Sequence, residues 1–294
     1  MADSTKTSTG SPAPPSLPSP PLFTLQIPAF DPYPGGKVVC TEAVEKGSRI
    51  YVLTFTAPAD NRLITTVCDT LVRALDILEV AYPSGAVVTT SGIEKFYSNG
   101  LDLKHAVENK GFWQESLYRM WARFLTYPMP TIALINGHAF AGGLMTAMHH
   151  DYRIFNPKKG FLCLNELEFG APLKAPMSGI FRIKTSPETY RDLVLESKRF
   201  PGPAALEAGL VDGLGGMDGV VKLVKERKLT EKGKTVYGEL KMEMYKESVK
   251  LLREFEESER EDERNLKMIG ERTKEAEAWV RKWAAKEGKT ESKL

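Results

Sequence analysis

The chain has 294 residues, 42% of them hydrophobic, which is enough to bury a sizeable core as one large domain or two small ones. Its formal net charge of +2 at pH 7 argues against nucleic acid or an anionic membrane surface as a partner of the whole molecule. No apolar run approaches the roughly 18 residues that a membrane-spanning helix needs, so we expect no membrane span.

The N-terminal segment, residues 1–21, is rich in Ser, Thr and Pro and is predicted to be disordered. It has neither the apolar stretch of a secretory signal nor the Arg-rich pattern of a mitochondrial presequence. Short strands are then predicted at residues 22–27, 37–41 and 49–56, with turns at Gly35-Gly36 and Lys46-Gly47. Asn61 is predicted to start a helix, because apolar residues recur at helical spacing over residues 63–78.

The middle of the chain alternates between strand and helix patterns, which is typical of an α/β fold. Further strands are predicted at residues 86–90, 131–135, 152–155 and 160–164. The turn Tyr97-Ser98-Asn99-Gly100 is followed by Asp102, which is predicted to open one long helix through about Leu125. After the strand that ends at Ile135, small residues predict a tight turn over residues 136–143 that leads into another helix.

The C-terminal part is predicted to be helical from Pro187 onward, with a short helix closed by Gly209 and a highly charged, solvated helix face within residues 230–286. We therefore divide the chain into a disordered N-terminus at residues 1–21, an α/β core at residues 22–225, a helical C-terminal region at residues 226–288 and a tail at residues 289–294. The tail ends in Ser292-Lys293-Leu294, the tripeptide that a peroxisomal import receptor recognises.

Motifs for several common chemistries are missing from the chain. Cys40, Cys68 and Cys163 are odd in number and far apart, which argues against a disulfide framework or a thiolate zinc site and predicts free thiols. The four histidines have no metal-ligand spacing, so we expect no metal. There is no Walker loop, dinucleotide fingerprint or G-x-S-x-G elbow, so we expect no bound cofactor.

Two strand-to-helix turns carry glycines that could serve chemistry. Glycine lets a backbone approach a ligand closely, and the first N–H groups of a helix have no partner within it. The N–H groups of Leu101 and Gly142 could therefore converge on one carbonyl oxygen, which is the geometry that stabilises an enolate or a tetrahedral anion. Each turn on its own is also compatible with an ordinary loop.

A third segment, residues 165–170, places Glu166 and Glu168 two positions apart in an otherwise apolar stretch that we expect to be extended. In an extended chain the two carboxylates point to the same face. A carboxylate in apolar surroundings has a raised proton affinity and suits the work of a general base. The alternative is the edge of a surface strand with two solvated acids.

These segments together resemble the enoyl-CoA hydratase/isomerase (crotonase) family. The resemblance lies in residues 96–103, 135–143, 150–154, 165–172 and 208–212, in the family's order between Leu22 and Val224. It implies an α/β core of repeated ββα units and a helical C-terminal region that serves trimer assembly and covers the acyl pocket. It also implies an acyl-CoA substrate, with coenzyme A as part of the substrate and not a cofactor, and a homotrimer or hexamer.

The resemblance also assigns residues to roles. It implies that Leu101 and Gly142 supply the two oxyanion-hole N–H groups and that the substrate-binding residues are Tyr97, Ser98, Asn99, Gly100, Leu101 and Gly142. Glu166 matches the family's later acid, since Gly170 stands four residues beyond it. Met145 stands where hydratases carry a second, water-activating glutamate, and Lys174 stands where dienoyl-CoA isomerases carry an aspartate.

One acid without a water-activating partner implies a Δ3,Δ2-enoyl-CoA isomerase with Glu166 as its catalytic base, similar to the peroxisomal members of the family. The implied setting is fatty-acid β-oxidation in the peroxisomal matrix, and a specialised secondary metabolism is equally compatible. The alternatives are Glu168 as the base, an enoyl-CoA hydratase or acyl-CoA thioester hydrolase of the same fold, and a non-catalytic acyl-CoA-binding subunit. Arg62, near the predicted helix start, is either a contact for a coenzyme A phosphate or an exposed cation.

Overall fold

The computed structural model describes residues 20–45, 47–232 and 236–287. Within them a seven-stranded sheet has the order β1-β2-β3-β4-β6-β8-β10 and a three-stranded sheet the order β5-β7-β9. The larger sheet consists of β1 (Phe23–Ile27), β2 (Gly36–Glu45), β3 (Ser48–Thr56), β4 (Ala86–Ser91), β6 (Thr131–Ile135), β8 (Tyr152–Phe155) and β10 (Gly213–Leu214). The smaller one consists of β5 (Phe96–Ser98), β7 (His138–Phe140) and β9 (Leu162–Cys163). Pairing is antiparallel from β1 to β3 and parallel elsewhere.

The chain passes three times from the larger sheet to the smaller one and then into a helix. The three units are β4-β5 followed by α2 (Leu103–Glu108), β6-β7 followed by α4 (Gly142–Met148), and β8-β9 followed by α5 (Glu166–Phe169). This arrangement confirms the predicted α/β core of repeated ββα units. Because β5, β7 and β9 are neighbours and parallel, the segments that follow them leave the small sheet at one edge.

The remaining helices surround the sheets. They are α1 (Thr65–Ala81), the π-helical segment η1 (Phe112–Tyr118), α3 (Arg119–Thr126), α6 (Ala175–Lys184), α7 (Pro187–Glu196), α8 (Gly202–Glu207), α9 (Met217–Glu226), α10 (Leu229–Lys232), α11 (Tyr237–Met244), α12 (Lys246–Arg253) and α13 (Phe255–Lys286). The helical C-terminal part therefore begins with α6 at Ala175, earlier than the predicted start at Pro187. Within the described residues no helix is both long and apolar enough to cross a membrane.

Alternate side chains of the large sheet enter two hydrophobic clusters, as the period of two in a strand requires. Tyr51 and Leu53 of β3 pack in the larger cluster, which contains the buried faces of α1 and α3. Ile50, the residue before Tyr51, packs instead in the cluster formed with Val220 and Val224 of α9. The central strands of the large sheet are therefore covered on both faces.

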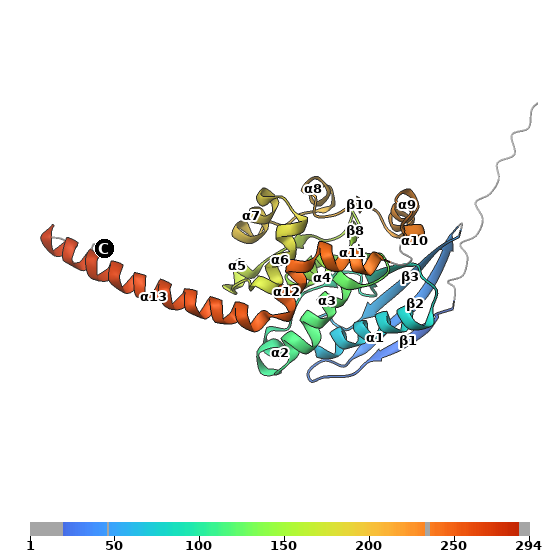
Figure 1. The fold of residues 1–294 in the computed structure, drawn as a ribbon, viewed down its shortest axis with the longest axis horizontal. Coiled ribbons are helices and arrows are strands. Elements are labelled where there is room, and N and C mark those ends of the chain that lie inside the picture. Colours follow the sequence, from blue (N-terminus) through green and yellow to red (C-terminus); the bar gives the residue numbers. More distant parts are fainter. Residues whose placement is uncertain (1–19, 46, 233–235, 288–294) are drawn as a thin grey trace, which may run out of the picture.

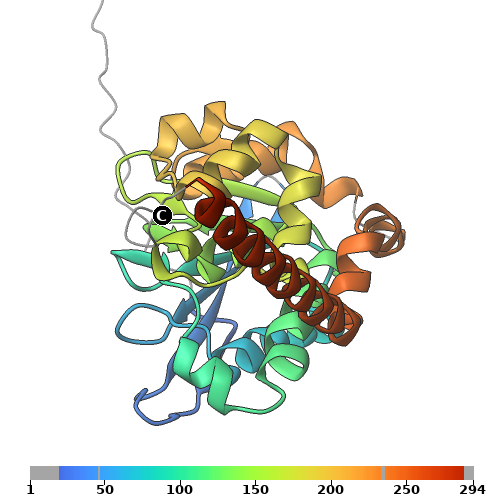
Figure 2. The same cartoon turned by 90° about the vertical axis from the view of Figure 1, so that its left-hand side faces the viewer.

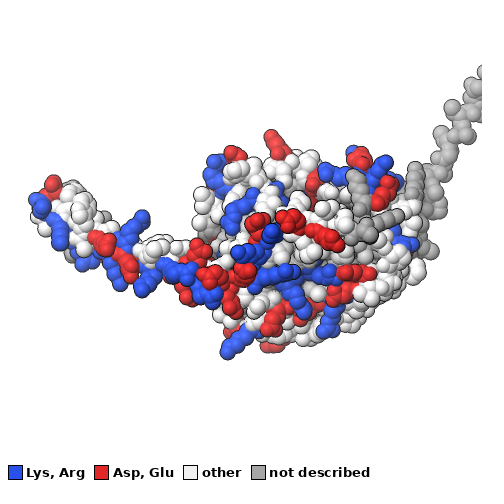
Figure 3. Space-filling model, in the orientation of Figure 1, with Lys and Arg blue, Asp and Glu red and all other residues white. Residues whose placement is uncertain are grey.

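The longest helix, α13, leaves the body and projects outward from it (Figures 1 and 2). Its charges are of both signs, as the space-filling view shows, and Glu257 pairs with Arg260 at 2.8 Å and with Arg264 at 3.2 Å (Figure 3). This confirms the predicted solvated helix face. The peroxisomal tripeptide at 292–294 and residues 1–19 of the predicted disordered N-terminus lie outside the described residues.

The predicted long helix from Asp102 to Leu125 is wrong in its continuity. Asp102 does cap α2, since its Oδ1 accepts a hydrogen bond from His105 N at 2.8 Å. The helix is then interrupted around Gly111, whose φ of +84° is left-handed, and helical structure resumes as η1 and α3. The predicted turn at Tyr97 is also wrong, because Tyr97 and Ser98 belong to β5.

Asn61 does not start α1, which begins at Thr65. Asn61 has a φ of +54°, and its buried amide accepts from Ala57 N at 2.7 Å and donates to Ser91 Oγ at 2.7 Å. Its side chain thus ties three segments together instead of capping a helix, which local sequence patterns cannot reveal.

Candidate functional site

A cavity of about 440 Å³ lies where the segments after β5, β7 and β9 meet. Its lining residues are Arg62, Asn99, Leu101, Leu103, Trp113, Ala141, Gly142, Met145, Asn165, Glu166, Phe169, Ala171, Pro172, Lys174 and Met177. The wall is mainly apolar with a few polar groups, which is the usual character of a small-molecule site.

The loop after β5 brings Leu101 to the cavity wall. Gly100 has a φ of +84°, and a Cβ at this position would lie 2.9 Å from Phe140 O, so only glycine fits. Gly100 O accepts a hydrogen bond from Leu63 N at 2.9 Å. Because the C=O and N–H of a trans peptide point in opposite directions, the Leu101 N–H points away from Leu63. In the described part of the chain, it has no hydrogen-bond acceptor.

The start of α4 brings a second N–H to the same place. The first hydrogen bond within this turn of helix runs from Met145 N to Ala141 O at 3.0 Å, so Gly142 N–H has no acceptor in the helix. Ala141, just before it, has the strained φ of +47°. A Cβ at Gly142 would lie 2.9 Å from Leu101 Cδ2 and 3.4 Å from Leu101 N. The structure thus brings Leu101 and Gly142, whose N–H groups have no acceptor in these turns, side by side in the wall of one cavity.

Glu166 at the start of α5 is the acid that lines the cavity. Its Oε2 is buried and has no hydrogen-bond partner in the described residues, and the same holds for Asn165 Oδ1. Burial raises the pKa of the Glu166 carboxyl from 4.5 to about 7, and a hydrogen bond to its own backbone N–H lowers this pKa by less. A carboxyl group with such a pKa is well suited to exchange protons near neutral pH.

The prediction that Glu166 and Glu168 share a face of an extended stretch is wrong. The segment forms one helical turn, α5, which ends at Gly170 with a φ of +66°. Residues two apart on a helix do not face each other. Glu168 is exposed, does not line the cavity and pairs with Arg199 at 3.3 Å.

Two side chains that differ from the family's catalytic acids also line the cavity. Met145 is 1% exposed and adds apolar surface to the wall. Lys174 forms an ion pair with Glu259 of α13 at 2.6 Å, which links the cavity wall to the projecting helix.

Only some of the six predicted substrate-binding residues line the cavity. Asn99, Leu101 and Gly142 line the cavity, whereas Tyr97, Ser98 and Gly100 do not. The Tyr97 hydroxyl is buried against Thr89 Oγ1 at 2.8 Å, and Ser98 Oγ donates to Asn61 O at 2.8 Å. Tyr97 and Ser98 are therefore corrected from substrate contacts to supports of the loop that carries Leu101.

Sequence reasoning missed several residues of the wall. Trp113 reaches the cavity from η1, and Met177 reaches it from α6. A local signal for Trp113 is Gly111, which precedes η1 with a left-handed φ of +84°. Ala141 gave no signal, because a non-glycine residue at positive φ is not expected from composition.

Among the described residues, the buried histidines and cysteines do not form a comparable site. His149 and His150 are buried at the end of α4, where His149 stacks on Trp121 and His150 packs at a tilt against Phe124, and burial lowers the pKa of both imidazoles. The described residues contain no group of three or more His, Cys, Asp or Glu that could hold a metal ion. The three cysteines are buried free thiols, as predicted.

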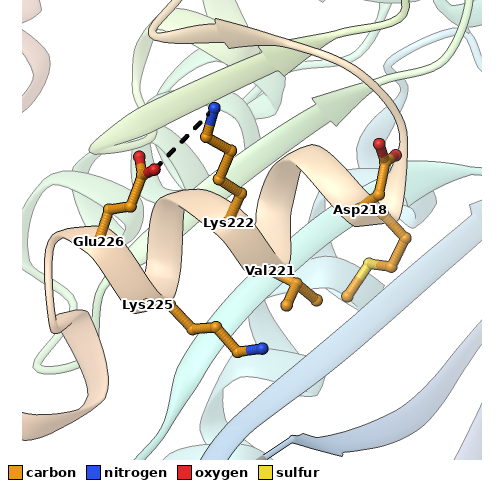
Figure 4. A pocket seen from close by; sticks show the side chains of 6 residues that line it. Asp218, Val221, Lys222, Lys225 and Glu226 are labelled. Atoms are coloured by element: carbon orange, nitrogen blue, oxygen red, sulfur yellow. Dashed lines mark ion pairs between the residues drawn. The ribbon is translucent and has the colours of Figure 1, made fainter.

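A larger hollow of about 560 Å³ lies on the outside of α9 (Figure 4). All of the residues that line it come from this one helix, and the ion pair between Lys222 and Glu226 spans 3.9 Å along its surface. Groups on one exposed helix face do not converge on a ligand. The cavity beside Glu166 is therefore the better candidate, although it is smaller.

Comparison with known proteins gives three kinds of match. Residues 45–282 match the family model described as enoyl-CoA hydratase/isomerase. The chain is 35% identical over 185 residues to enoyl-CoA delta isomerase 3 of Arabidopsis thaliana, covering 59% of this chain and 76% of that protein. It is 30% identical over 218 residues to the peroxisomal enoyl-CoA delta isomerase 1 of the same plant, covering 70% and 90%. The fold is similar to that of the human mitochondrial delta3-delta2-enoyl-CoA isomerase, with a TM-score of 0.63, 24% identity, and coverage of 81% of this chain and 98% of that one.

Proposed function

This chain belongs to the enoyl-CoA hydratase/isomerase family, and from that premise we propose that it shifts the double bond of 3-enoyl-CoA thioesters to the conjugated trans-2 position. Curated relatives named enoyl-CoA delta isomerases support this enzyme class, at 35% and 30% identity. The observation that carries the specific reaction is the buried, unpartnered Oε2 of Glu166 in the same cavity as the N–H groups of Leu101 and Gly142.

The two N–H groups form the oxyanion hole of the proposed reaction. The thioester carbonyl oxygen accepts hydrogen bonds from Leu101 N–H and Gly142 N–H. Loss of a C2 proton places negative charge on this oxygen as a dienolate forms, and fixed donors lower the free energy of that state. Both donors are held by the backbone, so they need little reorganisation when the charge develops.

Glu166 carries the proton. Its carboxylate takes a proton from C2, and the resulting carboxylic acid returns a proton to C4, so the double bond moves from C3–C4 to C2–C3. One group is sufficient, because the base of the first step is the acid of the second. No atom is gained or lost between substrate and product, and the reaction needs no cofactor beyond the coenzyme A of the substrate.

The residues around Glu166 favour isomerisation over hydration. Adding water across a double bond needs a group that orients and activates the water molecule. Met145 lies in the wall, and its side chain has no oxygen or nitrogen with which to do this. The apolar side chains of Trp113, Phe169 and Met177 further reduce the space for water beside the dienolate.

The proposal extends to the setting of the enzyme. Two Arabidopsis relatives are named peroxisomal, and the proposed setting is likewise the peroxisomal matrix, with Ser292-Lys293-Leu294 as the proposed segment that the import receptor recognises. Fatty-acid β-oxidation is the proposed pathway. We also propose a homotrimer or hexamer, in which a long helix such as α13 can contact a second copy.

The experiment is an incubation of the purified chain with cis- and trans-3-enoyl-CoA esters of several chain lengths. Products are separated and identified by mass and by the absorbance of the conjugated thioester. We expect a conjugated product of unchanged mass. A product heavier by one water indicates a hydratase, free coenzyme A indicates a thioester hydrolase, and binding without turnover indicates a non-catalytic subunit. Each of these three results contradicts the proposal.

A further inference from the structure

The loop between β3 and α1 holds the loop that carries Leu101. Asn99 N donates to Asp60 O at 3.0 Å, and Leu63 N donates to Gly100 O at 2.9 Å. Leu63 and Leu101 form an isolated parallel bridge. The backbone of residues 60–63 thus acts as a partner strand for the loop that bears the first oxyanion donor.

The guanidinium group of Arg62 adds two side-chain hydrogen bonds to this contact. Its Nε donates to Asp60 Oδ2 at 3.1 Å, and its Nη1 donates to Leu101 O at 3.0 Å. Asp60 Oδ2 also accepts from Asn99 Nδ2 at 2.6 Å. The guanidinium is planar and rigid, so these two bonds fix the direction of the Leu101 carbonyl. Arg62 lines the cavity, yet these two donors are directed at the protein.

We propose that Arg62 is a positioning residue that sets the direction of the Leu101 N–H, an inference that rests on the proposed function. Two successive carbonyls around Leu101 are held, Gly100 O by Leu63 N and Leu101 O by Arg62. The Leu101 N–H lies in the peptide that Leu63 holds, and Arg62 holds the next peptide, so the loop has little freedom to rotate on either side of Leu101. Without the guanidinium, the Leu63 hydrogen bond alone holds the donor, and its direction towards the carbonyl oxygen of the substrate is less well fixed.

A contact between Arg62 and a phosphate of coenzyme A is the competing role. The two roles differ in what they do to catalysis. A nucleotide contact binds substrate and transition state equally and changes KM, whereas a misdirected donor weakens the charged transition state more than the neutral substrate and lowers kcat. They also differ in substrate, since an N-acetylcysteamine thioester has no nucleotide.

The test compares Arg62→Ala, Arg62→Lys and Asp60→Asn with the wild type, on a 3-enoyl-CoA and on the matching 3-enoyl N-acetylcysteamine thioester. The control is Arg191→Ala, which removes an exposed arginine that is also ion-paired with an aspartate, Asp192, at 3.4 Å on α7. We expect Arg62→Ala to lower kcat roughly tenfold to a hundredfold on both thioesters, with little change in KM. Lysine has one ammonium group and cannot hold both partners, so Arg62→Lys should recover only a small part of the loss.

A second measurement does not need turnover. A saturated acyl-CoA labelled with ¹³C at the thioester carbonyl is bound to each protein, and its carbonyl stretch is recorded by infrared spectroscopy. A stretch at lower frequency on the wild type than in water reports hydrogen bonds to the oxygen, and Arg62→Ala and Asp60→Asn should lose part of this shift. Thermal unfolding of each variant checks that it is folded, and Arg62→Lys and Asp60→Asn replace Arg62→Ala if that variant does not fold.

The outcomes separate the two proposals. No shift on the wild type contradicts the oxyanion hole of the proposed function. A shift that is the same in wild type and in all folded Arg62 and Asp60 variants overturns the role of Arg62 alone. A KM that is raised on the coenzyme A ester only, with unchanged kcat, also overturns it, because this result assigns Arg62 to the nucleotide. Full recovery of kcat by Arg62→Lys overturns it as well, because a positive charge without the guanidinium geometry would then be sufficient.

Discussion

Replacing Glu166 with glutamine removes the proposed base while it keeps the shape of the side chain. An amide cannot accept the C2 proton, and the same group is needed again to protonate C4. General acid–base groups contribute about 10²- to 10⁴-fold to rate, so we expect Glu166→Gln to lose at least a hundredfold in kcat. Since the amide fills the same volume, substrate binding should change little.

The same substitution should stabilise the fold at neutral and alkaline pH. The pKa of Glu166 is raised from 4.5 to about 7 because the ionised carboxylate is buried. Below pH 4.5 the group is neutral in both the folded and unfolded states. As the pH rises towards 7, the group ionises in the unfolded chain but resists ionisation in the fold, so the wild type loses stability. This difference in pKa between the folded and unfolded states corresponds to about 3 kcal/mol, an upper value because a partly exposed group relaxes.

The assay combines turnover with urea unfolding of wild type and Glu166→Gln at pH 5 and pH 8. We expect the free energy of unfolding of the variant, relative to wild type, to grow by about 2 kcal/mol between these pH values. A variant that keeps near wild-type kcat would refute Glu166 as the base. A stability difference that does not change with pH would refute the reasoning about its burial.

Three further predictions concern the same cavity. Wild-type kcat/KM should rise with pH to a plateau, and half of the rise should be reached near the Glu166 pKa of about 7. A kcat/KM that falls over pH 5–8 would contradict a carboxylate base. Glu168→Gln should keep kcat within about twofold, since Glu168 lies outside the cavity, and a loss above about tenfold assigns the base to Glu168. Ala141→Gly should raise the free energy of unfolding by about 1 kcal/mol in urea, because it relieves the φ of +47°, and a clear loss of stability shows that this conformation is not strained.

The α/β order, most strand positions and the two glycine turns could be predicted from the sequence. Strands such as β6 (Thr131–Ile135) and β8 (Tyr152–Phe155) lie where their β-branched and aromatic residues predict them. Gly100 and Gly142 gave a usable signal, because both stand where a side chain would collide with a neighbouring segment. The ordered motifs then led to the three groups, Leu101, Gly142 and Glu166, that the structure brings to one cavity.

The rest depends on contacts that local patterns do not contain. The turn of helix α5 is too short to show a helical period, so the stretch around Glu166 resembled a strand. Asn61 resembles a helix cap by residue type, but its amide bonds to Ala57 and Ser91 instead. The hydrogen bond from Arg62 to Leu101 O joins two loops that are 39 residues apart in the sequence, which no spacing rule could have indicated.

The central claim is that one carboxyl group carries a proton from C2 to C4 without adding water. The most direct measurement uses a 3-enoyl-CoA with two deuterium atoms at C2, incubated in ordinary water and analysed by mass spectrometry and NMR. We predict a conjugated product that keeps one deuterium at C2 and, in a measurable fraction, carries the other at C4, and Glu166→Gln should form almost none of it. A product that has gained water, or one in which C4 never carries deuterium, would contradict the account.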